Sequence, residues 1–77
     1  MPARPANPGQ GDFVVEAAFP GFRIRERTGE KDWREIAKEP DRLKALSLAS
    51  DLAAQAGTRA WTYELDNQFL EIAPTRS

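Results

Sequence analysis

The segment EPDRLKALSLASDLAAQAG, residues 39–57, restricts the fold more than any other part of this 77-residue chain. It is the only stretch that is long and periodic enough to organise a hydrophobic core. At about 100° per residue, its alanine and leucine side chains gather on one broad helical face. The members of this face are Ala45, Leu46, Leu48, Ala49, Leu52, Ala53 and Ala56. Because many of them are alanines, we expect the helix to lie close against the surface that it covers.

Both ends of this segment carry helix-end signals. Pro40 suits the first helical position, where a backbone N–H is not needed. Asp41 places a negative charge in the first turn, where the helix dipole attracts it. Gly57 can adopt the left-handed conformation that ends many helices. The sequence therefore predicts one amphipathic helix between Glu39 and Gly57.

The composition argues against several classes of protein. The chain has no cysteine and therefore no disulfide framework, thiolate zinc site or thiol nucleophile. It also lacks histidine, the commonest metal ligand and the commonest general base near neutral pH. Eleven basic and twelve acidic side chains give a net charge of −1, which argues against a general polyanion binder. No apolar run approaches the length of a membrane span or signal peptide, so we expect a soluble cytoplasmic protein.

The chain divides into a leader, one domain and a short tail. Residues 1–11, MPARPANPGQG, are rich in proline and glycine and are expected to be a disordered leader. Residues 12–74 are expected to form a single α+β domain, near the lower size limit for folding without covalent or metal staples. Residues 75–77, which follow Pro74, are expected to fray.

Residues 12–27 have the pattern of a β-hairpin. The runs FVVEAAF and FRIRER flank Pro20-Gly21, which is a turn signal. A four-residue loop from Phe19 to Phe22 would set Glu16 opposite Arg25. One face would then carry Phe13, Val15, Ala17, Phe19, Phe22 and Ile24. The other would carry Val14, Glu16, Ala18, Arg23, Arg25 and Arg27.

The segment DWREIAK, residues 32–38, fits two structures. Asp32 and Glu35 match a capping box at the start of a helix. The alternation of its side chains fits a short strand equally well, and Pro40 closes the segment in either case. We favour the strand because a third antiparallel neighbour would widen the sheet.

Residues 59–73 predict a second hairpin. Asp66-Asn67 are residue types that tolerate the backbone conformations of a two-residue turn. Pairing across this turn places Phe69 opposite Glu64 on the exposed face. On the face toward the helix, the same register puts Trp61, Tyr63, Leu70 and Ile72.

These elements predict an α+β fold of the order ββ(β)αββ. The sheet is expected to be antiparallel and built from two hairpins, with a possible fifth strand at residues 32–38. The helix is expected to pack on one face of the sheet. The second face would then be left in water or against a partner.

No catalytic constellation is visible in the sequence. The available acid–base groups are carboxylates such as Glu16, Glu64 and Glu71, together with Tyr63 and the lysines. Such groups need a cleft that shifts a pKa, and a domain this small seldom has one. A phosphate-binding glycine-rich loop, a GxSxG motif and EF-hand spacing are all absent. We therefore predict that the chain is not an enzyme and uses no cofactor or metal.

The feature most like a binding site is a stripe of arginines. Arg23, Arg25 and Arg27 would project side by side about 6.5–7 Å apart, close to the phosphate spacing of single-stranded nucleic acid. Together with an exposed Trp33 or Phe69, they would form a surface on which bases stack on the ring and phosphates bind the arginines. The same residue types are enriched in protein-interface hot spots. The alternative is a solvated, charged sheet face, which also protects an edge strand from aggregation.

The order of elements resembles that of some small phage and prophage proteins. The shared features are Asn7-Pro8-Gly9 before the first strand, an alanine-rich helix ending near Gly57, and a final strand FLEIAP at Phe69 to Pro74. Among the proteins that it resembles are certain anti-CRISPR proteins that bind type I surveillance complexes. The resemblance implies a non-enzymatic inhibitor that occludes a protein surface or a nucleic-acid channel.

The sequence thus predicts a non-catalytic module that binds another protein or protein complex, plausibly a phage-type inhibitor. The predicted contacts are Arg23, Arg25, Arg27, Trp33 and Phe69. The first alternative is a nucleic-acid-binding accessory protein that uses the same residues. The second is a homodimer closed through the sheet face. No membrane partner is expected.

Overall fold

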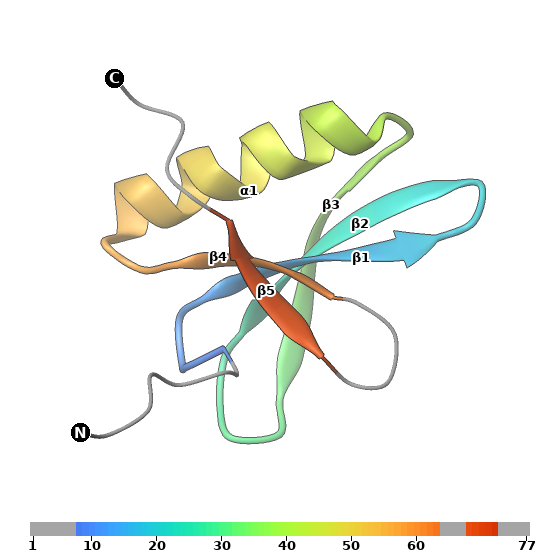
Figure 1. Cartoon of the computed structure of the whole chain (residues 1–77). Helices are drawn as coiled ribbons and strands as arrows, with labels where there is room; N and C mark the ends of the chain where they lie inside the picture. Colours follow the sequence, from blue (N-terminus) through green and yellow to red (C-terminus); the bar gives the residue numbers. More distant parts are fainter. Residues whose placement is uncertain (1–7, 64–67, 73–77) are drawn as a thin grey trace.

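The computed structural model describes residues 8–63 and 68–72 of the chain. Six elements follow one another in the order β1–β2–β3–α1–β4–β5 (Figure 1). Their bounds are β1 Phe13–Ala18, β2 Gly21–Arg27, β3 Trp33–Glu39, α1 Arg42–Ala56, β4 Ala60–Tyr63 and β5 Phe69–Ile72. The strands form one five-stranded sheet in the order β3-β2-β1-β4-β5. The predicted α+β class is therefore confirmed.

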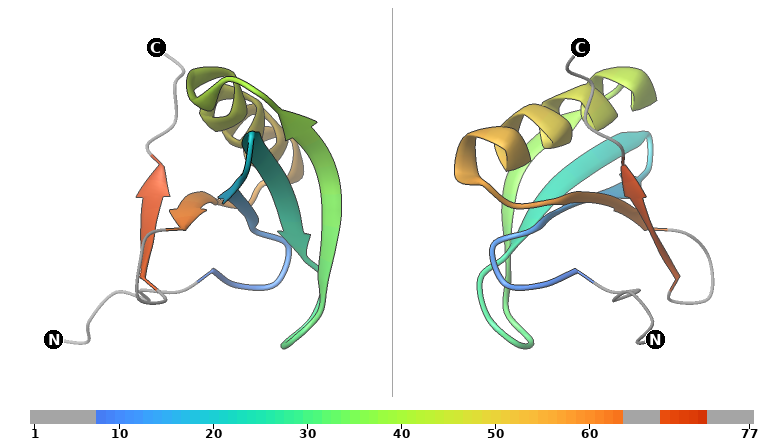
Figure 2. Two further views of the ribbon diagram at one scale, coloured as in Figure 1. Left: turned by 90° about the vertical axis from the view of Figure 1, so that its right-hand side faces the viewer. Right: turned by 60° about the vertical axis from the view of Figure 1, so that its left-hand side comes forward.

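The hydrophobic core lies between α1 and one face of the sheet (Figures 1 and 2). Its buried members are Phe13, Val15, Ile24, Ala45, Ala49, Ala53 and Ala60. Leu46, Leu48 and Leu52 are half-buried around this core, as the predicted helical face requires. Ala56 is exposed, so its placement on the buried face was wrong. Because alanines form the centre of the helical face, the helix backbone can approach the sheet closely.

The two ends of α1 differ in how well the sequence predicted them. Gly57 has φ 72° and ends the helix in the left-handed conformation, as predicted. The N–H of Thr58 then donates to the carbonyl of Ala53 at 2.8 Å. Pro40 is not the first helical residue, because Asp41 is the N-cap and the helix begins at Arg42. The preceding strand β3 continues to Glu39, so Pro40 belongs to the bend between strand and helix.

The sheet is mixed and not purely antiparallel as predicted. β1 and β4 run parallel, with Val14 beside Trp61, while the other neighbouring pairs are antiparallel. The cause is the helical connection. α1 carries the chain from the edge strand β3 back across the sheet, and β4 then enters alongside the central strand β1.

The first hairpin forms, but its predicted register is wrong by two residues. Val15 pairs with Ile24 and Glu16 with Arg23, and only Phe19 and Pro20 lie between the strands. Because side chains alternate with a period of two, an even shift leaves every residue on its predicted face. The separation of apolar from charged residues in this hairpin therefore survives.

Residues 33–39 form strand β3, which confirms the strand and excludes the helix alternative. β3 pairs antiparallel with β2 along its whole length. The register shifts between Ile24 and Arg25, where β3 contains one extra residue, Ile36.

The second hairpin also forms, but its register is wrong by one residue. Tyr63 pairs with Phe69, and Ala60 pairs with Ile72. An odd shift reverses the faces of one strand, here β4. Ala60 lies in the core under α1, and Trp61 and Tyr63 lie on the opposite face, contrary to prediction. Ala60 is buried in the core beside its register partner Phe13, whereas the indole of Trp61 on the other face donates to Asp12. The predicted turn at residues 66–67 lies outside the described residues.

Residues 8–11, part of the predicted leader, lie against the start of the sheet. Pro8 is buried, and the N–H of Gly11 donates to the carbonyl of Arg27 at 2.7 Å. Residues 1–7 and the predicted tail at residues 75–77 lie outside the described residues. In residues 8–63 and 68–72, no helix has the length and apolar character needed to cross a membrane.

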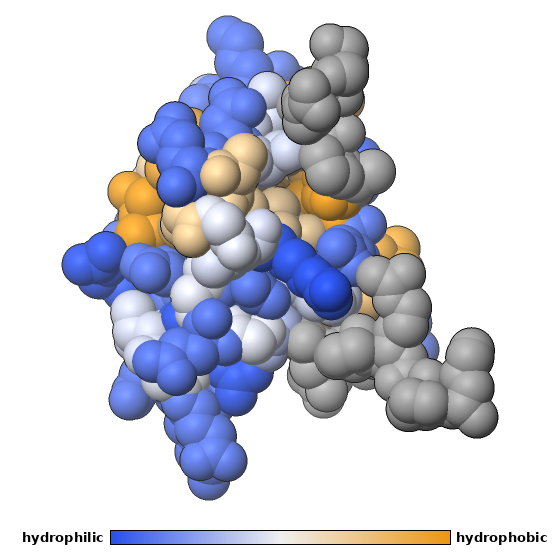
Figure 3. Space-filling model, turned by 90° about the vertical axis from the view of Figure 1, so that its left-hand side faces the viewer, coloured by the Kyte–Doolittle hydropathy of each residue, from blue (hydrophilic) through white to orange (hydrophobic). Residues whose placement is uncertain are grey.

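The end of the molecule where α1 stops is shown in Figure 3. In this view, hydrophobic side chains form separate small patches near the level of the helix. The lower part, toward the β2–β3 turn, is hydrophilic. The described atoms on this end form no broad apolar surface.

Candidate functional site

The face of the sheet opposite α1 is hereafter called the open face. Within the described residues, no helix or strand covers it. The strand registers place on it Val14, Glu16, Ala18, Arg23, Arg25, Arg27, Trp33, Glu35, Lys38, Trp61, Tyr63, Phe69 and Glu71. It therefore combines four large aromatic side chains with several charges, whereas the covered face is mainly apolar and includes the rings of Phe13 and Phe22.

The open face is hollowed at its centre. Trp33 belongs to β3 and Phe69 to β5, the two edge strands of the sheet. In a flat five-stranded sheet these edges would lie about 19 Å apart. Both side chains nevertheless line one pocket of about 240 Å³. The sheet must therefore curve, and Figure 2 shows β3 and β5 standing on either side with α1 above. This aromatic pocket is lined by Val14, Glu16, Arg25, Trp33, Tyr63 and Phe69.

Two ring contacts order the walls of the aromatic pocket. Tyr63 and Phe69 meet edge to face, with centroids 5.2 Å apart and planes at 63°. On the other side, the guanidinium carbon of Arg25 lies 4.9 Å from the ring centroid of Trp33. Each wall is thus held by a contact between neighbouring strands, and the pocket is formed before any partner arrives.

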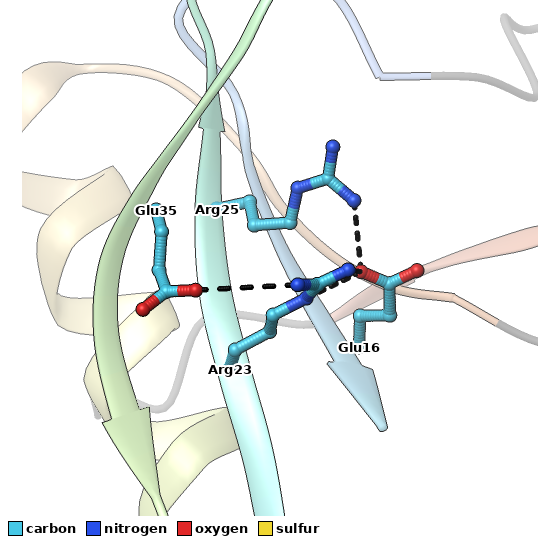
Figure 4. A network of polar contacts seen from close by, with 4 residues as sticks. All are labelled: Glu16, Arg23, Arg25 and Glu35. Carbon is cyan, nitrogen blue, oxygen red and sulfur yellow. Dashed lines mark hydrogen bonds and ion pairs between the residues drawn. The ribbon is translucent and has the colours of Figure 1, made fainter. Parts of the chain in front are cut away.

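A charge network crosses the open face from β1 to β3 (Figure 4). Glu16 Oε1 accepts from Arg23 Nε at 2.9 Å and from Arg25 Nη1 at 2.8 Å. Arg23 Nη1 lies 4.0 Å from Glu35 Oε1 on β3. Two carboxylates therefore balance two guanidinium groups, and the network has no net charge.

The position of Glu16 changes its ionisation. Partial burial raises the pKa of its carboxyl, because removal from water disfavours the charge. Hydrogen bonds and positive charge from Arg25 and Arg23 outweigh burial, so the pKa lies below the ordinary value of 4.5. Glu16 is ionised at neutral pH. An acid–base catalyst working near pH 7 needs the opposite shift.

Arg27 does not line the aromatic pocket. Its guanidinium donates to the backbone carbonyls of Gly29, at 2.9 Å, of Pro8 and of Glu30. These contacts tie the N-terminal segment to the β2–β3 turn. The third arginine of the predicted stripe is therefore engaged with backbone carbonyls.

Asp12 stabilises the end of the open face where β1 and β4 begin. Its carboxylate is buried and accepts from Trp61 Nε1 at 2.9 Å, the Gly9 N–H at 2.8 Å and the Arg59 N–H at 3.2 Å. These bonds fix the start of β4 beside β1. Sequence reasoning did not identify this role, because only tertiary structure brings Trp61 next to Asp12.

Three of the five predicted contact residues, Arg25, Trp33 and Phe69, line the aromatic pocket together. Arg23 joins them through Glu16, and Arg27 stays apart. The pocket residues absent from the predicted contacts are Val14, Glu16 and Tyr63. The hairpin pattern had already placed Val14 and Glu16 on the correct face. No local signal placed Tyr63, because its face depends on the register of the second hairpin.

Within residues 8–63 and 68–72, no group of three or more acidic, histidine or cysteine side chains has the geometry to hold a metal ion. Comparisons with protein-family models, with curated proteins and with solved structures find no match to this chain. The functional assignment therefore depends on the geometry of the open face.

Proposed function

We propose that this chain is a small non-catalytic module that binds another protein through its open face, with the aromatic pocket at the centre of the interface. The observation that carries the proposal is the convergence of Trp33 and Phe69, from opposite sheet edges, on one hollow beside Arg25. Tryptophan, tyrosine and arginine are the residue types most enriched in interface hot spots, which gather in pockets near the interface centre.

The fixed arrangement of the side chains in the pocket walls also supports binding. The Arg25–Trp33 and Tyr63–Phe69 contacts hold the walls in place, so few side chains lose freedom when a partner docks. The neutral charge network beside the pocket adds polar groups without a strong field. A partner would therefore be recognised by shape and hydrogen bonding more than by long-range attraction.

Nucleic acid is the less favoured partner. Arg23 and Arg25 share Glu16, and Arg27 is engaged with backbone carbonyls. The charge of Arg23 and Arg25 is balanced by Glu16 and Glu35. The evenly spaced stripe that motivated a nucleic-acid site is thus shortened to two arginines whose positive charge is neutralised, although Arg25 keeps unbonded N–H groups.

The resemblance to phage-type inhibitors suggests a consequence of binding. An inhibitor of this kind would act by occluding the surface on which its open face docks. Inhibition and an anti-CRISPR role remain predictions, and the binding surface is the part that the geometry supports.

Site-specific photocrosslinking tests the binding surface. A benzoylphenylalanine placed at position 69 points into the aromatic pocket, whereas one at position 70 is on the other face of the same strand. In cells that express the chain, we expect a discrete adduct from position 69 and none from position 70. The adduct should be sensitive to protease and resistant to nuclease. Equal adducts from both positions, or none from position 69, would refute the proposal.

Light scattering after size-exclusion chromatography separates the two alternatives. The pure chain is run at low and moderate salt, alone and with a short single-stranded oligonucleotide. A shift with oligonucleotide that salt abolishes would favour nucleic acid, because phosphate contacts weaken steeply with salt. A dimer insensitive to salt would favour self-association through the open face.

A further inference from the structure

Glu16 has one carboxylate oxygen without a partner among the described residues. Its hydrogen bonds from Arg23 and Arg25 both converge on Oε1. Figure 4 shows Oε2 pointing away from both arginines, toward the side of the sheet where β4 and β5 lie. The side chain lines the aromatic pocket and is only 23% exposed. This oxygen is reachable by water, so a ligand that displaces the water has to supply a hydrogen-bond donor in its place.

Arg25 supplies donors to the same pocket. Its Nη1 is bonded to Glu16, and its Nε and Nη2 make no hydrogen bond to the described residues. A guanidinium carries five N–H groups in a rigid plane, so several remain for a ligand. The polar side of the pocket thus offers both a donor and an acceptor, opposite the rings of Trp33, Tyr63 and Phe69.

This combination selects against charged ligand groups. A carboxylate would meet Glu16, and an ammonium group would meet Arg25, whose guanidinium already lies over Trp33. A neutral hydroxyl can accept from Arg25 and donate to Glu16 at the same time. The surrounding rings favour an aromatic body attached to that hydroxyl. A phenol satisfies both conditions.

We propose that the aromatic pocket binds a tyrosine side chain presented by the partner protein. The ring lies among Trp33, Tyr63 and Phe69, and the hydroxyl bridges Arg25 and Glu16. This inference rests on the proposed function and specifies what the open face recognises. A phenylalanine in the same place would displace water from the free oxygen of Glu16 without supplying a donor, which lowers affinity.

The test is an NMR titration of the ¹⁵N-labelled full chain with N-acetyl-tyrosinamide, using N-acetyl-phenylalaninamide as the probe that lacks the hydroxyl. We expect saturable shifts of the Trp33 indole N–H and of the amides of Val14, Glu16 and Phe69 with the tyrosine probe. The phenylalanine probe should bind about tenfold more weakly, the ratio expected for one unsatisfied acceptor.

Two neighbouring variants control the titration. Phe69→Ala removes one wall of the pocket and should abolish the shifts. Leu70→Ala changes an exposed side chain on the other face of the same strand and should leave them unchanged. Amide spectra of both variants show whether each is folded before the probe is added.

The outcomes separate this inference from the proposed function. Equal affinity for the two probes would overturn phenol recognition, while the crosslink from position 69 would still support the binding face. Absence of shifts with both probes would overturn the inference in the same way. If uridine monophosphate shifts the pocket residues and neither amide does, nucleic acid replaces a protein partner and both proposals fail.

Discussion

The two faces of the sheet use the same five strands in different ways. The covered face is mainly apolar, with Phe13 among its buried residues, and its central Ile24 is fully buried under a helix whose contact surface is mostly alanine. The open face carries large rings and balanced charges around a pocket of about 240 Å³. Close packing leaves the centre of the covered face, around Ile24, fully buried. The rings of Trp33, Tyr63 and Phe69 lie around a hollow, because no helix of the described residues packs over them.

The difference shows within a single strand. Ile24 has no exposed surface, while Arg23 and Arg25 on either side keep 36% and 27% of their side-chain surface exposed. Alternation along β2 thus separates a residue that supports folding from two that are available for recognition. Four substitutions test this division of roles.

The largest loss of stability is expected from Ile24→Ala. Truncating a fully buried isoleucine costs about 2–5 kcal/mol of unfolding free energy, because apolar contacts are lost and a cavity remains. Urea denaturation monitored by tryptophan fluorescence measures this loss. Arg25→Ala, the next residue on the open face, should cost less than about 1 kcal/mol. Similar losses for both variants would contradict the assignment of the two faces.

Asp12→Ala should be the most damaging change outside the covered core. It leaves the buried indole N–H of Trp61 without an acceptor, and we expect a loss of about 2–3 kcal/mol. Asp12→Asn retains one acceptor oxygen and should lose less. Hydrogen exchange at the Arg59 amide provides a local readout, because this group also donates to Asp12. Unchanged exchange in Asp12→Ala would show that the anchor is not needed.

Phe69→Ala should have an intermediate effect on stability. The ring is half-buried and meets Tyr63 edge to face, so its removal is expected to cost about 1–2 kcal/mol. Leu70→Ala should cost less, because Leu70 is 57% exposed. Thermal unfolding of the pair gives the comparison. A larger loss from Leu70→Ala would mean that the faces of β5 are assigned the wrong way round.

The smallest effect concerns pH. Since the folded-state pKa of Glu16 lies below 4.5, its ionised form stabilises the protein above that pH. The contribution disappears as pH falls through the lowered folded-state pKa. We expect Glu16→Gln to cost about 0.5–1 kcal/mol at pH 7 and to approach wild type in acid. Melting temperatures measured between pH 7 and pH 3 should therefore converge. A constant difference would show that the charge of Glu16 does not stabilise the fold.

The two hairpins explain why the sequence located part of the candidate site and missed the rest. In the first hairpin the register error was two residues, so Arg23 and Arg25 kept their predicted face. In the second it was one residue, which moved Trp61 and Tyr63 from the core to the open face. The alternation of side chains in β4 allows either Trp61 and Tyr63 or their neighbours to face the helix. Its contacts with β1, far away in sequence, select one of them.

The sequence by itself determined the helix with its glycine end, the four strands of the two hairpins, and the two faces of the first hairpin. These features depend on residues close together in the chain, where periodicity and turn chemistry act directly. Tertiary structure decided the parallel pairing of β1 with β4, the faces of β4, and the aromatic pocket. Those depend on the Asp12–Trp61 bond, on the close approach of an alanine-rich helix, and on a curvature that brings Trp33 and Phe69 together from opposite edges. Each of them arises only when segments far apart in the sequence pack against one another.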